Sequence, residues 1–150
     1  MRSKHVYLLD VNVLVSLFWP AHEHHQLAQH WFASHANDTW ATCPFTQLGF
    51  VRILSNPAFS PGAVVPAEAM RILSLNLAHP SHTFWPDALS IHSIQEPFSS
   101  RLRGYKQLRD AYLLATFIKR KATLATLDKS IIHLLPDADS QRQYVEVIRA

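Results

Sequence analysis

Three aspartates that stand far apart in the sequence could together carry out metal-assisted chemistry. Asp10 and Asp128 each follow a short apolar segment, and Asp110 lies in the first half of a long amphipathic segment. Carboxylates that converge repel one another unless some are protonated or a divalent cation neutralises them. Oxygen ligands without a cysteine or a helical histidine pair favour Mg²⁺ or Mn²⁺ over zinc. If the three side chains meet, the pattern predicts a hard-metal site that hydrolyses a phosphodiester.

Basic and polar side chains precede Asp110 on the same predicted helix. Arg103, Lys106 and Gln107 stand seven, four and three residues before it, spacings that share one helical face. Between positions 101 and 121 there are seven Lys or Arg residues and one acid. This local positive charge favours a phosphate backbone as the ligand, with these three side chains as candidate substrate contacts.

Short strands are expected to position two of the three acids. Residues 5–10 and 123–127 are apolar runs typical of strands buried on both faces, and each leads into an aspartate. Because the carboxyl ends of parallel strands meet at one edge, Asp10 and Asp128 should lie together there. Strands alternating with helices predict an α/β fold, a three-layer α/β/α sandwich with a mostly parallel central sheet. Further strands are expected at 39–43, 83–85 and 144–148, helices at 13–18, 21–36, 44–56, 66–78, 104–121 and 129–135, and irregular structure at 91–100.

Composition narrows the class of protein. With 150 residues, 48% of them hydrophobic, the chain is the size of one domain with its own core, expected to span residues 1–150. A formal charge of +3 favours a polyanionic partner. The single cysteine, Cys43, excludes an intramolecular disulfide and a cysteine zinc cage. No apolar stretch suits a signal peptide or a membrane span, so a soluble cytoplasmic protein is expected.

Four segments carry a resemblance to a known family. LLDVNVLVSL, TQLGFVRILSNP, RDAYLLATF and TLATLDKS occur in the order seen in PIN domains, and the chain most resembles the VapC toxins. The likeness covers nearly the whole sequence. It implies a three-layer α/β/α endoribonuclease that uses Mg²⁺ or Mn²⁺, forms a homodimer and is inhibited by a cognate antitoxin protein.

The resemblance also implies roles for single residues. Asp10 matches the acid of the first strand, Asp110 the helix acid and Asp128 the acid after the later strand, while Asn12 matches the polar residue that braces the first acid. Where the family has a glutamate as its second acid, this chain has Gln47. An amide brings no negative charge, so metal should bind more weakly. The prediction is an active toxin ribonuclease; the alternative is a catalytically weak or inert PIN-like protein that binds RNA or a partner.

Other interpretations of the same residues stay open or are disfavoured. A phosphatase with Asp10 as nucleophile is disfavoured because its second acid would be Asn12, whereas a DNA nuclease shares the metal chemistry and stays open. Each aspartate could instead serve a structural role, as a helix cap or a surface ion pair. The histidines at 22–25 are interpreted as a solvated helix start, because adjacent helical residues do not face one another. Trp31, Trp40 and Trp85 are expected in the core.

Overall fold

The centre of the fold is a five-stranded sheet in which every neighbouring pair of strands is parallel. The computed structural model describes residues 4–59, 62–86 and 89–150. The strand order is β3-β2-β1-β4-β5, so the first strand lies in the middle. The strands are β1 (Val6–Leu9), β2 (Thr39–Thr42), β3 (His82–Phe84), β4 (Thr123–Thr126) and β5 (Val145–Val147).

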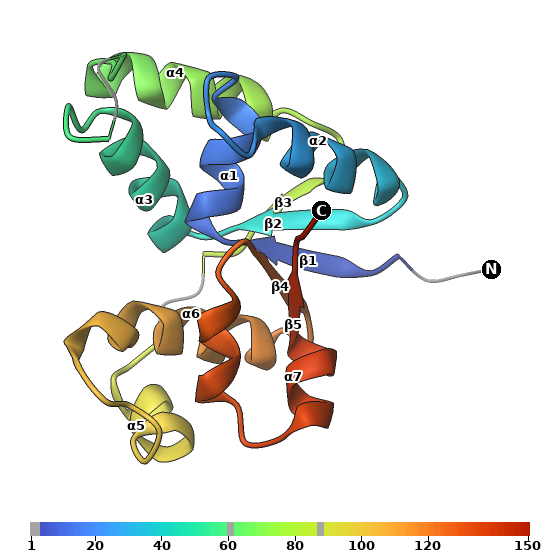
Figure 1. Cartoon of the computed structure of the whole chain (residues 1–150), viewed down its shortest axis with the longest axis vertical. Coiled ribbons are helices and arrows are strands. Elements are labelled where there is room, and N and C mark those ends of the chain that lie inside the picture. The colour runs from blue at the N-terminus through green and yellow to red at the C-terminus, as the bar shows by residue number, and fades with distance from the viewer. Residues whose placement is uncertain (1–3, 60–61, 87–88) are drawn as a thin grey trace.

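Helices cover both faces of this sheet, as Figure 1 shows. One layer holds α1 (Val11–Phe18), α2 (His25–Ser34), α3 (Pro44–Leu54) and α4 (Pro66–Leu77). The opposite layer holds α5 (His92–Phe98), α6 (Leu108–Lys119), α7 (Ala138–Tyr144) and two 3₁₀ helices, η1 (Tyr105–Gln107) and η2 (Lys129–Leu134). The expected three-layer α/β/α sandwich is therefore confirmed.

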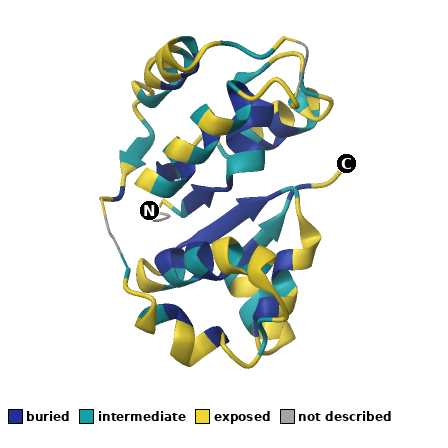
Figure 2. Cartoon of the chain, turned by 90° about the vertical axis from the view of Figure 1, so that its left-hand side faces the viewer, coloured by how far each residue is buried: buried dark blue, intermediate teal, exposed yellow. Residues whose placement is uncertain are grey.

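Each face of the sheet packs against its own hydrophobic core. Along β1, Tyr7 and Leu9 belong to the core under α1 to α4, whereas Leu8 belongs to the core under α6. Along β4, Ala125 belongs to the core under α1 to α4 and Leu124 to the core under α6. Successive strand residues point to opposite faces, so a strand buried on both sides needs a continuous apolar run. Figure 2 shows the buried strands between helices whose outer faces are exposed.

The chain leaves β1 and β4 toward opposite layers. β1 leads into α1 on one face, and the neighbouring β4 leads into η2 on the other. In open parallel sheets this divergence opens a crevice beyond the carboxyl ends of the two strands. Asp10 directly follows β1 and Asp128 lies two residues after β4, so the topology places both acids at that crevice.

The structure corrects several local expectations. α1 starts at Val11, two residues before the expected start at 13, and Asp10 caps it, because the Asp10 side chain accepts a hydrogen bond from the Val11 backbone N–H. The long helix expected from residue 104 starts at Leu108, after the 3₁₀ turn η1. The short helix expected at 129–135 is the 3₁₀ helix η2, Lys129–Leu134.

Two helices were not expected at all. Residues 91–100 contain α5, which buries Ile94 and Phe98 in the core despite Pro97 inside it. The second is α7, which follows the expected stop at Pro136 and is capped by Asp137. In the described parts of the chain, none of these helices has the length and apolar character that crossing a membrane requires.

Candidate active site

Asp10 is buried and firmly held at the start of α1. Its Oδ1 accepts the N–H of Val11 at 2.7 Å, and its Oδ2 accepts the hydroxyl of Thr126 at 2.7 Å. The side chain is only 9% exposed. Burial raises the pKa of Asp10, the two hydrogen bonds oppose that rise, and nearby Asp128 adds to it. Asp10 is thus a fixed carboxylate whose negative charge is costly unless a cation is near.

Thr126, the last residue of β4, connects Asp10 to Asp128. The Thr126 hydroxyl oxygen accepts the backbone N–H of Asp128 at 3.0 Å while it donates to Asp10. Asp128 itself is exposed, and its Oδ1 accepts both the N–H and the hydroxyl of Ser130, at 2.9 and 2.7 Å. Asp128 therefore caps η2 through Oδ1, and its Oδ2 takes no part in the contacts with Ser130.

Asn12 braces this arrangement through the segment after β4. Its Oδ1 accepts the N–H of Leu127 at 3.2 Å, and its Nδ2 lies 3.4 Å from the Thr126 hydroxyl oxygen. These contacts join α1 to the end of β4. Asn12 therefore acts on Asp10 through Thr126 and not by direct contact.

Asp110 comes from the opposite helical layer, in the first turn of α6. It is half-buried, and its carboxylate accepts no hydrogen bond from the residues that the structure describes. Burial first, and then the charges of Asp10 and Asp128, raise its pKa to about 6, while Arg109 opposes the rise. A carboxylate with free oxygens, held near two others, is the group most in need of a counter-ion.

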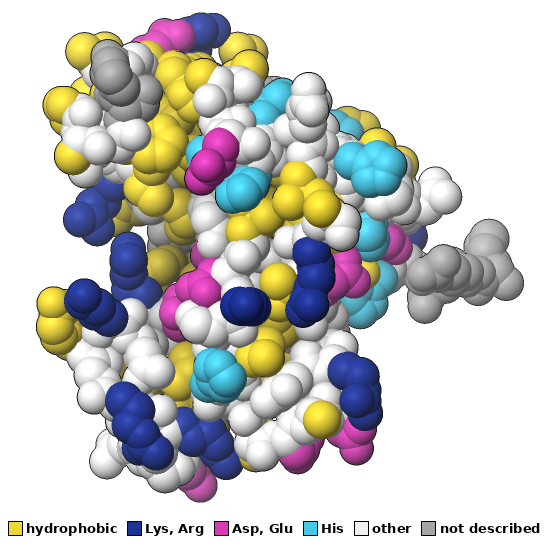
Figure 3. Space-filling view, in the orientation of Figure 1, with side chains coloured by type: hydrophobic (Ala, Val, Ile, Leu, Met, Phe, Trp, Pro, Cys, Tyr) yellow, Lys and Arg dark blue, Asp and Glu magenta, His cyan; other side chains and the backbone are white. Residues whose placement is uncertain are grey.

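The three aspartates line one pocket of about 280 Å³, which we call the acidic pocket. Figure 3 shows acidic side chains in the hollow between the two halves of the molecule, with Lys and Arg side chains around it. The pocket is lined by Asp10, Val11, Asn12, Phe45, Ile53, Lys106, Arg109, Asp110, Leu113 and Asp128. Acids from three distant segments thus share a cavity with basic side chains.

The donor set of the acidic pocket fits a hard divalent cation. All three acids offer oxygen, and the unpartnered Asp110 carboxylate is a ready ligand. Within the ranges 4–59, 62–86 and 89–150, no three Asp, Glu, His or Cys side chains converge closely enough to ligate one ion together. Mg²⁺ commonly keeps several water ligands and uses only one or two carboxylates, which suits this spacing.

The predicted substrate contacts are only partly at the pocket. Lys106 lines it, but Arg103 and Gln107 do not. The Arg103 backbone N–H instead donates to the Gln107 side chain at 2.5 Å, and the Arg103 guanidinium donates to the Ser100 carbonyl at 3.0 Å. Arg109, which sequence reasoning did not select, lines the pocket beside Asp110. Arg109 directly precedes Asp110 in the sequence, and this adjacency could have identified it as a candidate substrate contact.

Gln47, which stands where the resemblance implies a glutamate, is not among the pocket-lining residues. Its Nε2 donates to the hydroxyl oxygen of Thr42 at 3.0 Å, and Thr42 in turn lies 2.8 Å from Nε2 of His82. The amide is thus part of a hydrogen-bonded chain that runs to Thr42, the last residue of β2, and His82, the first residue of β3. The structure brings Asp10, Asp110, Asp128 and Asn12 together in one pocket, and Gln47 is not among the residues that line it.

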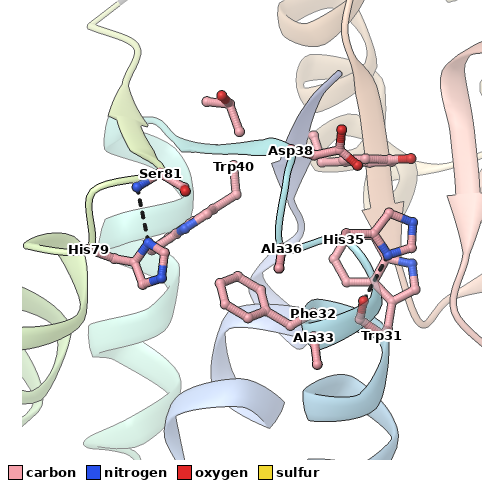
Figure 4. A pocket seen from close by; sticks show the side chains of 11 residues that line it. Trp31, Phe32, Ala33, His35, Ala36, Asp38, Trp40, His79 and Ser81 are labelled. Carbon is pink, nitrogen blue, oxygen red and sulfur yellow. Dashed lines mark hydrogen bonds between the residues drawn. The ribbon is translucent and has the colours of Figure 1, made fainter. Parts of the chain in front are cut away.

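A second pocket, of about 180 Å³, lies at the opposite edge of the sheet and is mainly aromatic. Figure 4 shows His35 against Trp31, with its Nδ1 2.7 Å from the Trp31 carbonyl oxygen. Asp38 is the one carboxylate among its lining residues. Trp31, Trp40 and Trp85 are buried, as expected of core residues. This pocket lacks the paired acids that phosphodiester hydrolysis needs.

Comparisons with known proteins agree with the geometry. The profile of the PIN domain matches residues 7–134. Ribonuclease VapC38 of Mycobacterium tuberculosis is 40% identical over 127 residues, which cover 85% of this chain and 88% of that protein. Ribonuclease VapC39 of the same species is 36% identical over 124 residues, with 83% and 89% covered. Ribonuclease VapC44, also from that species, is 37% identical over 135 residues, with 89% and 94% covered.

A solved structure shares the fold at low sequence identity. It is a chain of VapBC2 from Rickettsia felis, crystallised with a DNA fragment from its promoter. The TM-score is 0.59 with 14% identity, and the match covers 96% of this chain and 99% of that one. The likeness is therefore one of architecture, over nearly the full length of both chains.

Proposed function

The chain belongs to the PIN domain family, and we propose that it is a VapC-type ribonuclease, the toxin of a toxin–antitoxin pair, that hydrolyses RNA at the acidic pocket. Relatives that are 36–40% identical over most of the chain carry the name ribonuclease VapC. The observation that carries the proposal is the presence of Asp10, Asp110 and Asp128 in one pocket. An RNA-cutting toxin would act in the cytoplasm.

In this proposal Asp10, Asp110 and Asp128 would hold Mg²⁺ or Mn²⁺ together, one or two of them directly and the rest through water ligands of the ion. When bound, such an ion supplies an activated water and neutralises charge on the phosphate. Asp10 is fixed by Val11 and Thr126 and supplies a carboxylate of set orientation. The Asp110 carboxylate, which accepts no hydrogen bond from the residues that the structure describes, is free to ligate the ion or to accept a proton.

Basic side chains would hold the RNA backbone over these acids. Lys106 and Arg109 both line the acidic pocket, so a phosphate placed near the aspartates would meet two cations. Arg109 also counters the charge of Asp10 and Asp110 in the absence of metal. Arg109 would thus stabilise both the carboxylates and a bound phosphate.

Cleavage of RNA by the purified protein tests the proposal directly. Wild type should cut single-stranded RNA with Mg²⁺ or Mn²⁺, lose activity in EDTA and regain it when metal is restored. Asp10→Asn should abolish cleavage, whereas Asp139→Asn, an exposed acid in α7, should leave it unchanged. Metal-independent cleavage, or full activity of Asp10→Asn, would overturn the proposed site.

The proposed partners are a cognate antitoxin and a second copy of the chain. A small reading frame beside the gene should encode the antitoxin, and its product should copurify with the protein and suppress RNA cleavage. Light scattering on the purified chain measures whether it is a dimer. A neighbouring product that binds without inhibiting would contradict the toxin–antitoxin role.

A further inference from the structure

Two further hollows lie next to the acidic pocket along α1. The acidic pocket shares Asn12 and Ile53 with a middle hollow of about 340 Å³, whose other lining residues are Val15, His22, Asn56, Ala58 and Phe59. That hollow in turn shares His22 and Phe59 with an outer hollow of about 240 Å³, also lined by Trp19, Ala21 and Glu23. Because neighbouring hollows share lining residues, they lie in a row that leads away from the aspartates beside α1 and the end of α3, and we call this row the groove.

The chemistry of the groove changes with distance from the acidic pocket. Its middle part is lined mainly by apolar side chains, Val15, Ile53 and Ala58, and none of the described residues that line it is Lys or Arg. Its outer part carries the acid Glu23. Such walls suit bases, which are apolar on their faces, better than phosphates, which need cations.

His22 and Phe59 form a stacked ring pair at the junction of the two outer hollows. Their ring centroids lie 6.1 Å apart with an interplanar angle of 26°. Phe59 is 36% exposed, and its backbone N–H donates to the Asn56 carbonyl at 2.9 Å. The two rings therefore offer flat aromatic surface to the groove from an anchored position.

The His22 ring is held in place, and its surroundings favour the neutral form. Its Nδ1 accepts the backbone N–H of His24 at 3.0 Å and lies 3.2 Å from the Ser16 hydroxyl oxygen. Burial, followed by the neighbouring His24, lowers the pKa of His22. A neutral ring offers stacking surface and not a charge for phosphate, which agrees with the apolar wall beside it.

We propose that the His22–Phe59 ring pair stacks against an unpaired base of the RNA strand that runs from the acidic pocket along this groove. The inference rests on the proposed ribonuclease function and extends it to a defined substrate position. Aromatic rings stack on every base, so the contact selects for single-stranded RNA more than for a particular sequence. A duplex, whose bases are already stacked on one another, cannot offer one to this pair.

Binding measurements separate this contact from catalysis. In an Asp10→Asn background, affinity for a fluorescent single-stranded RNA octamer is compared with and without Phe59→Ala. Loss of one base–aromatic stack should weaken binding about tenfold. Phe59→Trp should retain the affinity. Phe84→Ala removes another exposed aromatic ring, on β3 and outside the groove, and serves as the matched control.

Abasic substitutions in the RNA identify the stacked base. One position of the octamer should lose affinity when its base is removed, and Phe59→Ala should then cause little further loss, because the same contact is already absent. Additive losses at every position would overturn the stacking contact. If Phe59→Ala leaves RNA affinity unchanged and weakens only antitoxin binding, the groove is a peptide site and the proposal is wrong.

The two proposals fail in different ways. Suppose that wild type cuts RNA and that Phe59→Ala has the same KM as wild type, both for a long RNA and for a dinucleotide. That result refutes the stacking contact and leaves the ribonuclease function intact. The expected result is a higher KM on the long substrate alone, with kcat preserved, since a dinucleotide does not reach the ring pair. If wild type neither binds nor cuts RNA, the ribonuclease function itself is refuted.

Discussion

The hydroxyl of Thr126 donates to Oδ2 of Asp10 at 2.7 Å and joins the carboxyl ends of the two central strands, β1 and β4. Thr126 has no exposed surface, and its oxygen also accepts the backbone N–H of Asp128 at 3.0 Å. One buried hydroxyl thus orients two of the three acids. The geometry of the acidic pocket therefore depends on a residue that does not line it.

Thr126→Val should destabilise the protein and impair the site while preserving side-chain shape. The valine leaves the Asp10 carboxylate and the Asp128 N–H without this partner, which should lower the free energy of unfolding by about 2 kcal/mol. Urea denaturation of the metal-free protein measures the change. Thr126→Ser keeps the hydroxyl and should lose much less. Equal midpoints for the valine and serine variants would show that the hydrogen bonds contribute little.

Asp110→Asn should stabilise the metal-free protein at neutral pH. The folded-state pKa of about 6 exceeds the ordinary 3.8, so the folded protein binds this proton more tightly than the unfolded chain. The resulting stability is present below about pH 4, falls as pH rises through about 6 and is absent above it. After allowance for solvent screening of a half-buried group, the difference at pH 7 is about 1 kcal/mol.

Thermal melts of both proteins across pH measure this effect. The variant should exceed wild type at pH 7 and match it at pH 4, and added Mg²⁺ should raise the melting temperature of wild type more than that of the variant. Asp139→Asn, an exposed acid outside the pocket, is the matched control. A wild type that is more stable than Asp110→Asn at pH 7 without metal would contradict the prediction.

Gly49→Ala should push α1 and α3 apart at the entrance to the acidic pocket. A Cβ at position 49 would lie 2.7 Å from Cγ2 of Val11, a β-branched side chain that cannot easily turn away. Overpacking of this kind costs about 1–3 kcal/mol, of which the better helix propensity of alanine offsets about 1. In a Val11→Ala background the clash is absent, so the same substitution should become stabilising. Denaturation of the four proteins tests for this change of sign.

The ends of β1 and β4 can be predicted from the sequence because a buried strand places a strict requirement on its residues. A strand buried on both faces must be apolar throughout, and an aspartate at its end is then conspicuous, so the positions of Asp10 and Asp128 at one sheet edge could be predicted. The same pattern cannot say which residue caps α1. Asp10 and Asn12 are both good caps, and only the contacts with Thr126 and Leu127 decide between them.

The face of α6 was harder to predict because its start is irregular. Offsets of three, four and seven residues share a face only in a continuous α-helix, whereas Tyr105–Gln107 form a 3₁₀ turn of about three residues per turn. Arg103 and Gln107 therefore bond to each other, and Arg109 takes a place at the pocket. Helix α5 was not predicted because its sequence contains Pro97, which disfavours a helix. The helix depends on the burial of Ile94 and Phe98 in the core.

Gln47→Glu distinguishes an active enzyme from an inert relative. Because Gln47 donates to Thr42 and does not line the acidic pocket, wild type should already cut RNA. The added carboxylate should lower the metal concentration for half-maximal activity by less than about tenfold, or ~1.4 kcal/mol. Metal titration of activity measures this, with Gln107→Glu as a control for added charge outside the pocket. An inactive wild type together with an active Gln47→Glu would establish the alternative, a PIN-like protein that has lost catalysis.

Arg109→Gln should weaken RNA binding more than Arg103→Gln, although both remove one positive charge. Arg109 lines the acidic pocket, whereas the Arg103 guanidinium donates to the Ser100 carbonyl outside it. A lost phosphate contact reduces the slope of log affinity against log salt concentration by about 1, irrespective of RNA sequence. Fluorescence anisotropy in the Asp10→Asn background, repeated at several salt concentrations, measures both slopes. Equal slopes for the two variants would mean that the RNA phosphates interact with the overall positive charge of residues 101–121 and not specifically with Arg109 in the acidic pocket.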